Sequence, residues 1–79
     1  MRTTDATPSL LVTGGTGFLG LHTCEYFHDL GWDVTAFDLK SFEPEDEITG
    51  VDYVEGDVRD EAAVEDAIEG MDYVVHTAA

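Results

Sequence analysis

The sequence predicts an α/β fold with a parallel sheet, because short apolar segments alternate with helical segments along its 79 residues. Three observations support this prediction. A buried-strand pattern at Leu10–Val12 leads into a glycine-rich turn and then into apolar residues spaced three and four apart. A β-branched and aromatic segment follows at Asp33–Asp38. Between residues 51 and 76 a strand pattern, a turn, a helix pattern and another strand pattern succeed one another.

The glycine-rich turn follows the first strand directly, in the stretch LLVTGGTGFLG at Leu10–Gly20. Gly14, Gly17 and Gly20 have the spacing GxxGxxG; one glycine allows a tight turn, one lets a pyrophosphate approach bare backbone, and one lets the helix pack close to the strand. The helix that begins at Phe18 offers unpaired N–H groups and the positive end of its dipole to an anion. We therefore expect a dinucleotide here; the alternative is a glycine-rich turn without a ligand. No Gly-Lys-Ser/Thr follows, which excludes a P-loop.

The first helix is expected to run from Phe18 to Gly31, which ends it. Small and apolar residues three and four positions apart are predicted to face the sheet, namely Gly20, Thr23, Cys24, Phe27 and Leu30. His22 and His28 also fall in this helix, but no further ligand stands at a metal-binding spacing, so we expect no metal site.

The second strand, DVTAFD at Asp33–Asp38, ends on a carboxylate. Asp38 follows Gly14 by 24 positions, near the ~20 expected for the acid that accepts hydrogen bonds from the adenosine ribose. The same carboxylate would repel a 2′-phosphate. We therefore expect NAD rather than NADP, with Lys40, two residues later, as the one feature that weakens this preference.

The remaining elements are read from turn residues and apolar spacing. Ser41–Gly50 is acidic without an apolar face and predicts a solvated loop or one short turn. Val51–Glu55 is the third strand, Glu61–Glu69 a helix with Asp60 as its N-cap, and Asp72–His76 the fourth strand. The buried stripe of that helix is expected at Val64, Ala67 and Ile68.

Right-handed crossovers place these strands in the order 3-2-1-4 in a parallel sheet, a partial doubly wound fold truncated after its fourth strand. The expected binding position is the crevice beyond the carboxyl ends of the strands, where the order reverses between the first and fourth strands. The glycine turn, Asp38, Asp57 and the residues after His76 all fall at this edge. Residues 1–8 are a polar arm and residues 9–79 form the domain portion.

The charge balance is strongly acidic, with 18 acidic and three basic residues, a net charge of −15 and a pI near 4.1. This charge argues against nucleic acid and anionic membranes as partners. Acids dispersed over the whole chain resemble the proteins of salt-loving archaea, where at ~1 M salt the Debye length is only ~3 Å. A merely acidic mesophilic protein is the alternative.

The single cysteine, Cys24, excludes an internal disulfide and a cysteine metal cluster. It is expected to be a small core residue. No apolar run approaches the ~18 residues of a membrane span, and residues 1–8 lack the apolar region of a signal peptide, so a cytoplasmic location is expected.

Three motifs in order resemble those of one family. TGGTGFLG at Thr13–Gly20 is similar to the cofactor motif of the extended short-chain dehydrogenase/reductase family, the NAD-dependent epimerases and dehydratases. GDVRD at Gly56–Asp60 resembles its adenine-pocket motif, and VVHTAA at Val74–Ala79 its fourth-strand motif. The resemblance covers residues 9–79 and implies the N-terminal part of a Rossmann domain that binds NAD(P).

The resemblance also implies a role for individual residues. Backbone N–H groups of Phe18 and Leu19 would meet the pyrophosphate, and Asp38 would hold the ribose. Asp57 and Val58 would face the adenine amine and ring. The small residues Ala78 and Ala79 would give the nicotinamide half close backbone contact, and His76 would have a structural role at the strand end.

The family's proton transfer depends on a tyrosine with a lysine four residues later. The residues four positions after the tyrosines Tyr26, Tyr53 and Tyr73 are Leu30, Asp57 and Thr77. We therefore expect no catalytic residue in this chain and no turnover by the chain alone. One interpretation is a fragment of an epimerase/dehydratase-like protein that needs its missing C-terminal part; the other is a stand-alone nucleotide-binding or redox-sensing module that acts through a partner. The fourth strand lacks the charge or proline that protects a sheet edge, which favours the fragment.

Overall fold

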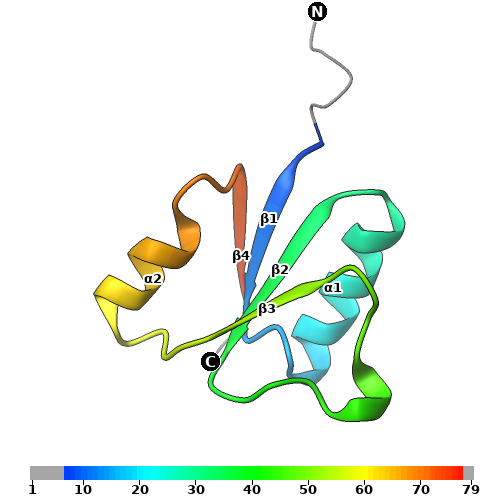
Figure 1. The fold of residues 1–79 in the computed structure, drawn as a ribbon, viewed down its shortest axis with the longest axis horizontal. Coiled ribbons are helices and arrows are strands. Elements are labelled where there is room, and N and C mark those ends of the chain that lie inside the picture. The colour runs from blue at the N-terminus through cyan, green and yellow to red at the C-terminus, as the bar shows by residue number, and fades with distance from the viewer. Residues whose placement is uncertain (1–6, 78–79) are drawn as a thin grey trace, which may run out of the picture.

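A computed structural model of the chain describes residues 7–77 and contains one parallel sheet of four strands (Figure 1). The elements, in chain order, are β1 (Ser9–Thr13), α1 (Phe18–Asp29), β2 (Asp33–Asp38), the 3₁₀ turn η1 (Pro44–Asp46), β3 (Asp52–Glu55), α2 (Glu61–Ile68) and β4 (Tyr73–His76). The strand order is β3-β2-β1-β4, and every pair is parallel. This confirms the predicted partial doubly wound fold.

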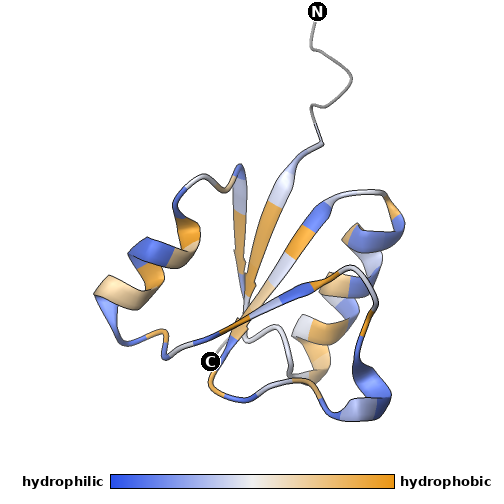
Figure 2. Ribbon diagram, viewed as in Figure 1, coloured by the Kyte–Doolittle hydropathy of each residue, from blue (hydrophilic) through white to orange (hydrophobic). Residues whose placement is uncertain are grey.

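The central strands β1 and β2 are buried on both faces, which explains their continuous apolar runs. Val12 of β1 lies in register between Ala36 of β2 and Val75 of β4. Figure 2 shows the resulting apolar segments along the inner strands and hydrophilic residues at η1. The buried strands hold the backbone that leads into the turn after β1.

Helix α1 covers one face of β1 and β2. The main core between them consists of Leu10, Val12, Cys24, Val34, Ala36 and Phe42. As predicted, Gly20 and Cys24 are buried and Phe27 is half-buried. The prediction for Leu30 was wrong: it is the C-cap residue, one position beyond the helix, and is 56% exposed. The ring of Trp32 packs on Phe27 instead, with ring centroids 4.7 Å apart.

Helix α2 lies on the other side of the sheet from α1 (Figure 1). Ala63 and Ala67 line a hollow together with Phe37 and Val54. Because successive side chains of a strand point to opposite faces of the sheet, Phe37 and Val54 lie on the face opposite α1. The predicted stripe of α2 is only half-buried, and no residue of this helix is buried. In the part of the chain that the structure describes, neither helix has the length and apolar character needed to cross a bilayer.

The segment between β2 and β3 contains the single turn η1, as the acidic composition predicts. Its one buried residue is Phe42, which is 8% exposed and faces Tyr53 with ring centroids 6.3 Å apart. This segment contains no α-helix, and it covers the outer part of the sheet face on which α1 packs.

Candidate functional site

The carboxyl ends of three strands bring the predicted site residues to one edge of the sheet. Gly14 follows β1, Asp38 is the last residue of β2, and Asp57 stands two residues after β3. One cavity is lined by Gly14, Asp38, Asp57 and Val58, although Gly14 and Asp57 are 43 positions apart in the sequence. Ala78 and Ala79, expected at the same edge after β4, lie outside the described residues.

The glycine turn is held by the end of β2. Gly14 adopts a φ of +70°, a conformation that favours glycine. The N–H groups of Gly14 and Gly15 donate to the carbonyl of Phe37 at 2.8 and 3.4 Å, and Gly17 N–H donates to the Gly14 carbonyl at 3.1 Å. The tight turn expected of one of the three glycines is thus present, at Gly14.

The glycines of the turn allow two close approaches. A Cβ at Gly20 would overlap the carbonyl of Gly14 and lie 2.7 Å from the Gly15 Cα. A Cβ at Gly15 would lie 2.6 Å from the Cβ of Ala36 and 2.9 Å from the carbonyl oxygen of Val12. Gly20 therefore lets the helix pack on the turn. The close approach to the strands is made by Gly15, which is not one of the three glycines of the GxxGxxG spacing.

The N-terminus of α1 faces solvent beside this turn. Its N-cap is Gly17, no side chain caps it, and its first turn holds no acid. Phe18 is 82% and Leu19 62% exposed. Because the first N–H groups of a helix have no acceptor within it, α1 presents free donors and the positive end of its dipole at this point. This environment suits an anion.

Asp38 is half-buried, and its carboxylate lies against the glycine turn. Its Oδ2 accepts hydrogen bonds from the N–H and the hydroxyl of Thr16, at 3.1 and 2.8 Å. Its Oδ1 accepts from the N–H of Leu39 at 2.7 Å. The predicted acid is therefore attached to the same turn that follows β1, and Thr16 is a site residue that motif spacing did not identify.

The cavity beside Asp38 has a volume of about 320 Å³, at the lower end of the range of roughly 300–1,000 Å³ for small-molecule pockets. Its lining residues are Gly14, Asp38, Leu39, Gly56, Asp57, Val58 and Arg59. Leu39 and Arg59 were not predicted, although both neighbour predicted residues in the sequence. Gly56 is required by packing, since a Cβ there would lie 2.5 Å from the ring of Phe37.

Asp57 and Arg59 form an ion pair at the mouth of this cavity. The Asp57 oxygens accept from the Arg59 backbone N–H at 2.8 Å, from Nε at 3.1 and 3.2 Å, and from the terminal guanidinium nitrogen at 2.8 Å. These bonds lower the pKa of the Asp57 carboxyl from 3.8 to about 2. The Arg59 guanidinium remains 85% exposed and is held at the cavity.

The end of β4 is fastened to the turn by two residues. The Thr13 hydroxyl and His76 Nδ1 are 2.9 Å apart, and Thr77 Oγ1 donates to the carbonyls of Thr13 and Gly14, the latter at 3.2 Å. This contact agrees with the structural role expected for His76. The carbonyl of Gly14 is thus held from the β4 side while its N–H is held from β2.

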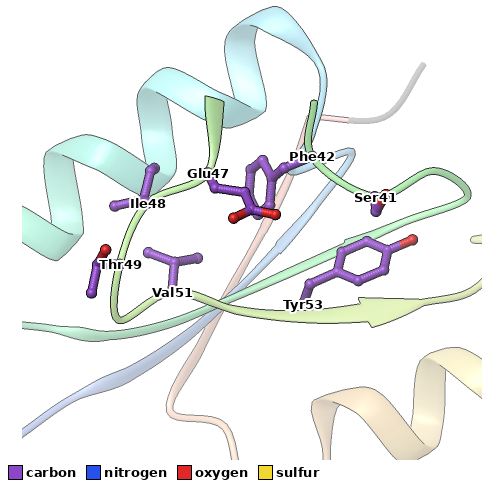
Figure 3. A pocket seen from close by; sticks show the side chains of 7 residues that line it. All are labelled: Ser41, Phe42, Glu47, Ile48, Thr49, Val51 and Tyr53. Carbon is purple, nitrogen blue, oxygen red and sulfur yellow. The ribbon is translucent and has the colours of Figure 1, made fainter. Parts of the chain in front are cut away.

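A second cavity of about 210 Å³ lies between the loop after β2 and the strand β3 (Figure 3). It is lined by Ser41, Phe42, Glu47, Ile48, Thr49, Val51 and Tyr53, and shares none of them with the cavity beside Asp38. The Tyr53 hydroxyl donates to the Asp38 carbonyl at 3.1 Å. Desolvation, followed by the charges of Glu55 and Asp38, raises the pKa of Tyr53. Tyr53 thus supports the end of β2 from this side.

Within the part of the chain that the structure describes, Cys24 and His22 stand apart from this site. Cys24 is fully buried, and its thiol lies 3.8 Å from the Gly15 carbonyl. Burial, and then the charge of Glu25, raises the pKa of Cys24 to about 11. His22 Nδ1 lies 2.8 Å from the Phe18 carbonyl of its own helix. Among residues 7–77, no group of three or more histidine, cysteine, aspartate or glutamate side chains is placed to hold a metal.

Comparisons with known proteins agree with this geometry. The model of a family described as the NAD dependent epimerase/dehydratase family matches residues 10–79. The chain is 43% identical over 70 residues to 2-alkyl-3-oxoalkanoate reductase of Stenotrophomonas maltophilia, a match covering 89% of this chain and 21% of that protein. It is 39% identical over 80 residues to UDP-glucose 4-epimerase of Bifidobacterium longum, covering 89% and 24%.

Among solved structures, the fold is similar to that of UDP-glucose 4-epimerase from Brucella ovis in complex with NAD. The TM-score is 0.79 at 30% identity, and the match covers 92% of this chain and 23% of the epimerase chain. The chain therefore spans between about a fifth and a quarter of the length of the relatives it matches.

Proposed function

The chain belongs to the NAD-dependent epimerase/dehydratase family, and from this premise we propose that its residues 9–79 bind the dinucleotide NAD. One observation carries the proposal: the uncapped N-terminus of α1 opens beside the carboxylate of Asp38. A dinucleotide has a diphosphate that needs donors and a ribose that needs an acceptor. The N–H donors of α1 and the carboxylate acceptor of Asp38 lie next to each other at this edge of the sheet.

The diphosphate lies at the head of α1 in this proposal. Backbone N–H groups of Phe18 and Leu19 donate to its oxygens, and the absence of a side chain at Gly17 leaves room for it. The positive end of the helix dipole adds to the attraction. Support comes from the exposure of both residues and from the lack of any acid in the first turn.

The adenosine half occupies the cavity between the ends of β2 and β3. Asp38 accepts a ribose hydroxyl, and Val58 contacts the adenine ring. Because the Asp57 carboxylate already accepts several hydrogen bonds from Arg59, the adenine amine has to share it with the guanidinium. The exposed guanidinium is also placed for a cation–π contact with a purine.

NAD is proposed rather than NADP because a 2′-phosphate would bring its negative charge beside Asp38. Among the described residues lining the cavity, the one cation is Arg59, and its charge is paired with Asp57. Lys40, two residues after Asp38, is not among the residues that line the cavity. Such a site favours two hydroxyls over a phosphate.

Ala78 and Ala79 are proposed to contact the nicotinamide half through their backbone, on the basis of the fourth-strand motif. None of the three tyrosines is followed four positions later by lysine. We therefore propose that these 79 residues bind the cofactor without turning over a substrate.

The net charge of −15 supports the proposal that the protein is adapted to high salt. Self-repulsion among so many carboxylates is screened at molar ionic strength. We propose a salt-rich cytoplasm as its working environment, and binding is best measured there.

Calorimetric titration at 2 M KCl tests the proposed function. We expect NAD to bind more tightly than NADP. D38A should weaken NAD binding about tenfold and should not weaken NADP binding, because it also removes the repulsion of the 2′-phosphate. D33A is the matched control, because Asp33 lies at the opposite end of the same strand. Absence of NAD binding by a chain whose circular dichroism shows it folded would refute the proposal.

A further inference from the structure

Thr16 is the residue through which the glycine turn contacts the acid at the end of β2. Both its N–H and its hydroxyl donate to Asp38 Oδ2, at 3.1 and 2.8 Å. The two residues are 22 positions apart, and both are half-buried. A single side chain therefore joins the proposed diphosphate and ribose subsites.

The Asp38 carboxylate is fixed from two sides. Thr16 supplies two donors to Oδ2, while the N–H of Leu39 donates to Oδ1. A carboxylate has about four lone-pair positions, so three bonds leave roughly one for a ligand. Any rotation of the carboxylate plane would break a charge-assisted hydrogen bond. The direction of the remaining acceptor position is thus set by protein contacts before a ligand arrives.

We propose that Thr16 is a positioning residue that aims Asp38 at the adenosine ribose and thereby sets the preference for NAD over NADP. This inference rests on the proposed function. A carboxylate held in place accepts a hydroxyl without losing further rotamer freedom of its own, whereas a 2′-phosphate meets a fixed negative charge that cannot rotate away. Losing the hydroxyl of Thr16 frees the carboxylate and reduces both effects.

The side-chain type matters for this role. A threonine has its hydroxyl on a branched Cβ with restricted χ1, so the donor points at Oδ2 with few competing rotamers. Valine has nearly the same shape without the donor, and serine keeps the donor with a freer χ1. The backbone N–H of residue 16 still donates in every variant, so the turn keeps one of its two bonds to Asp38.

The rival possibility is that the hydroxyl of Thr16 occupies the place of a ribose hydroxyl and must leave when the cofactor binds. Removing it would then tighten the binding of NAD. The two possibilities predict opposite signs for the same substitution.

Titrations with NAD and NADP at 2 M KCl on the 79-residue chain decide between them. We expect T16V to weaken NAD about tenfold and NADP less than about twofold, so that the preference for NAD falls. T16S should stay within about twofold of the unchanged chain. In a D38A background, T16V should have no further effect, because Thr16 acts through Asp38. The matched control is T49V, which removes an exposed hydroxyl from the loop before β3.

Three results would overturn the inference: tighter NAD binding by T16V, equal losses for NAD and NADP, or the same loss in the D38A background. T16A removes the hydroxyl without adding a methyl beside the carboxylate, and it carries the same expectation if T16V does not fold. When the inference alone fails, the unchanged chain still binds NAD and D38A still weakens it. If the proposed function is wrong, the unchanged chain binds neither dinucleotide, and the inference about Thr16 is then wrong as well.

Discussion

Gly20, in the first turn of α1, packs so closely on Gly14 that a Cβ at Gly20 would lie 2.7 Å from the carbonyl carbon of Gly14. The atoms that would collide belong to the backbone of the turn and cannot move aside as a flexible side chain can. Because Gly14 is also held by the Phe37 carbonyl and the Thr77 hydroxyl, the turn has little room to adjust. Gly17, three positions earlier, has only an ordinary contact, 3.5 Å from the Gly14 oxygen.

We predict that G20A lowers the free energy of unfolding by about 3 kcal/mol, because overpacking against backbone forces the helix and the turn apart. G17A should cost less than about 1 kcal/mol, since its φ of −79° suits alanine. The methyl of G17A, however, stands where the diphosphate is proposed to lie, and NAD affinity should fall at least about tenfold. Urea unfolding and NAD titration separate the two effects. Equal stability losses in both variants would contradict this assignment of roles.

The effect of Arg59 on the pKa of Asp57 should be measurable in an acid titration of the chain. A carboxyl whose pKa is lower in the folded than in the unfolded state contributes stability above its unfolded pKa, here near 3.8, and loses it as the pH falls through about 2. R59Q should return the pKa of Asp57 toward 3.8, as measured by carboxyl carbon NMR shifts. K40Q changes the net charge equally and should leave the pKa at about 2. An unchanged pKa in R59Q would show that the ion pair is not its cause.

The Cys24 thiol should be nearly inert in the native state. The thiolate is the reactive form, and burial raises the pKa to about 11 from the usual 9.0. At pH 8 this shift alone lowers the thiolate fraction by about 100-fold, so Ellman's reagent should react at least that much more slowly than with the chain in guanidinium. Native and unfolded rates that agree within about threefold would contradict the burial of Cys24.

Asp60 should stabilise α2 as its N-cap. Its Oδ1 accepts from the N–H groups of Ala62 and Ala63 at 3.1 and 3.3 Å. D60A should lower the free energy of unfolding by about 1 kcal/mol. D66A removes the same charge from the exposed interior of the helix and should be neutral or slightly stabilising, because alanine is the better helix former. A loss in D66A as large as that in D60A would assign the effect to charge instead of capping.

Much of the fold could be predicted because its signals are local. The β1 run, the glycine turn and the three- and four-residue spacing in α1 each follow from neighbouring residues, and the crossover rule then orders the strands. The turn η1 was likewise expected from the acidic, apolar-poor segment around Pro44. The exception, Leu30, fits the helical spacing but lies past the helix end, where Trp32 takes the contact with Phe27.

By itself the sequence determined the sheet, its strand order, and which residues reach the carboxyl edge, since backbone geometry and apolar spacing carry that information. Only the tertiary structure decided which groups meet there. The bond of Thr16 to Asp38, the closure of Arg59 on Asp57, and the packing of Gly15 on Ala36 join distant segments or depend on side-chain directions. The Thr16 and Gly15 contacts form only when β1 and β2 come together in space, and the Arg59 contact depends on how its side chain folds back on Asp57 within one loop.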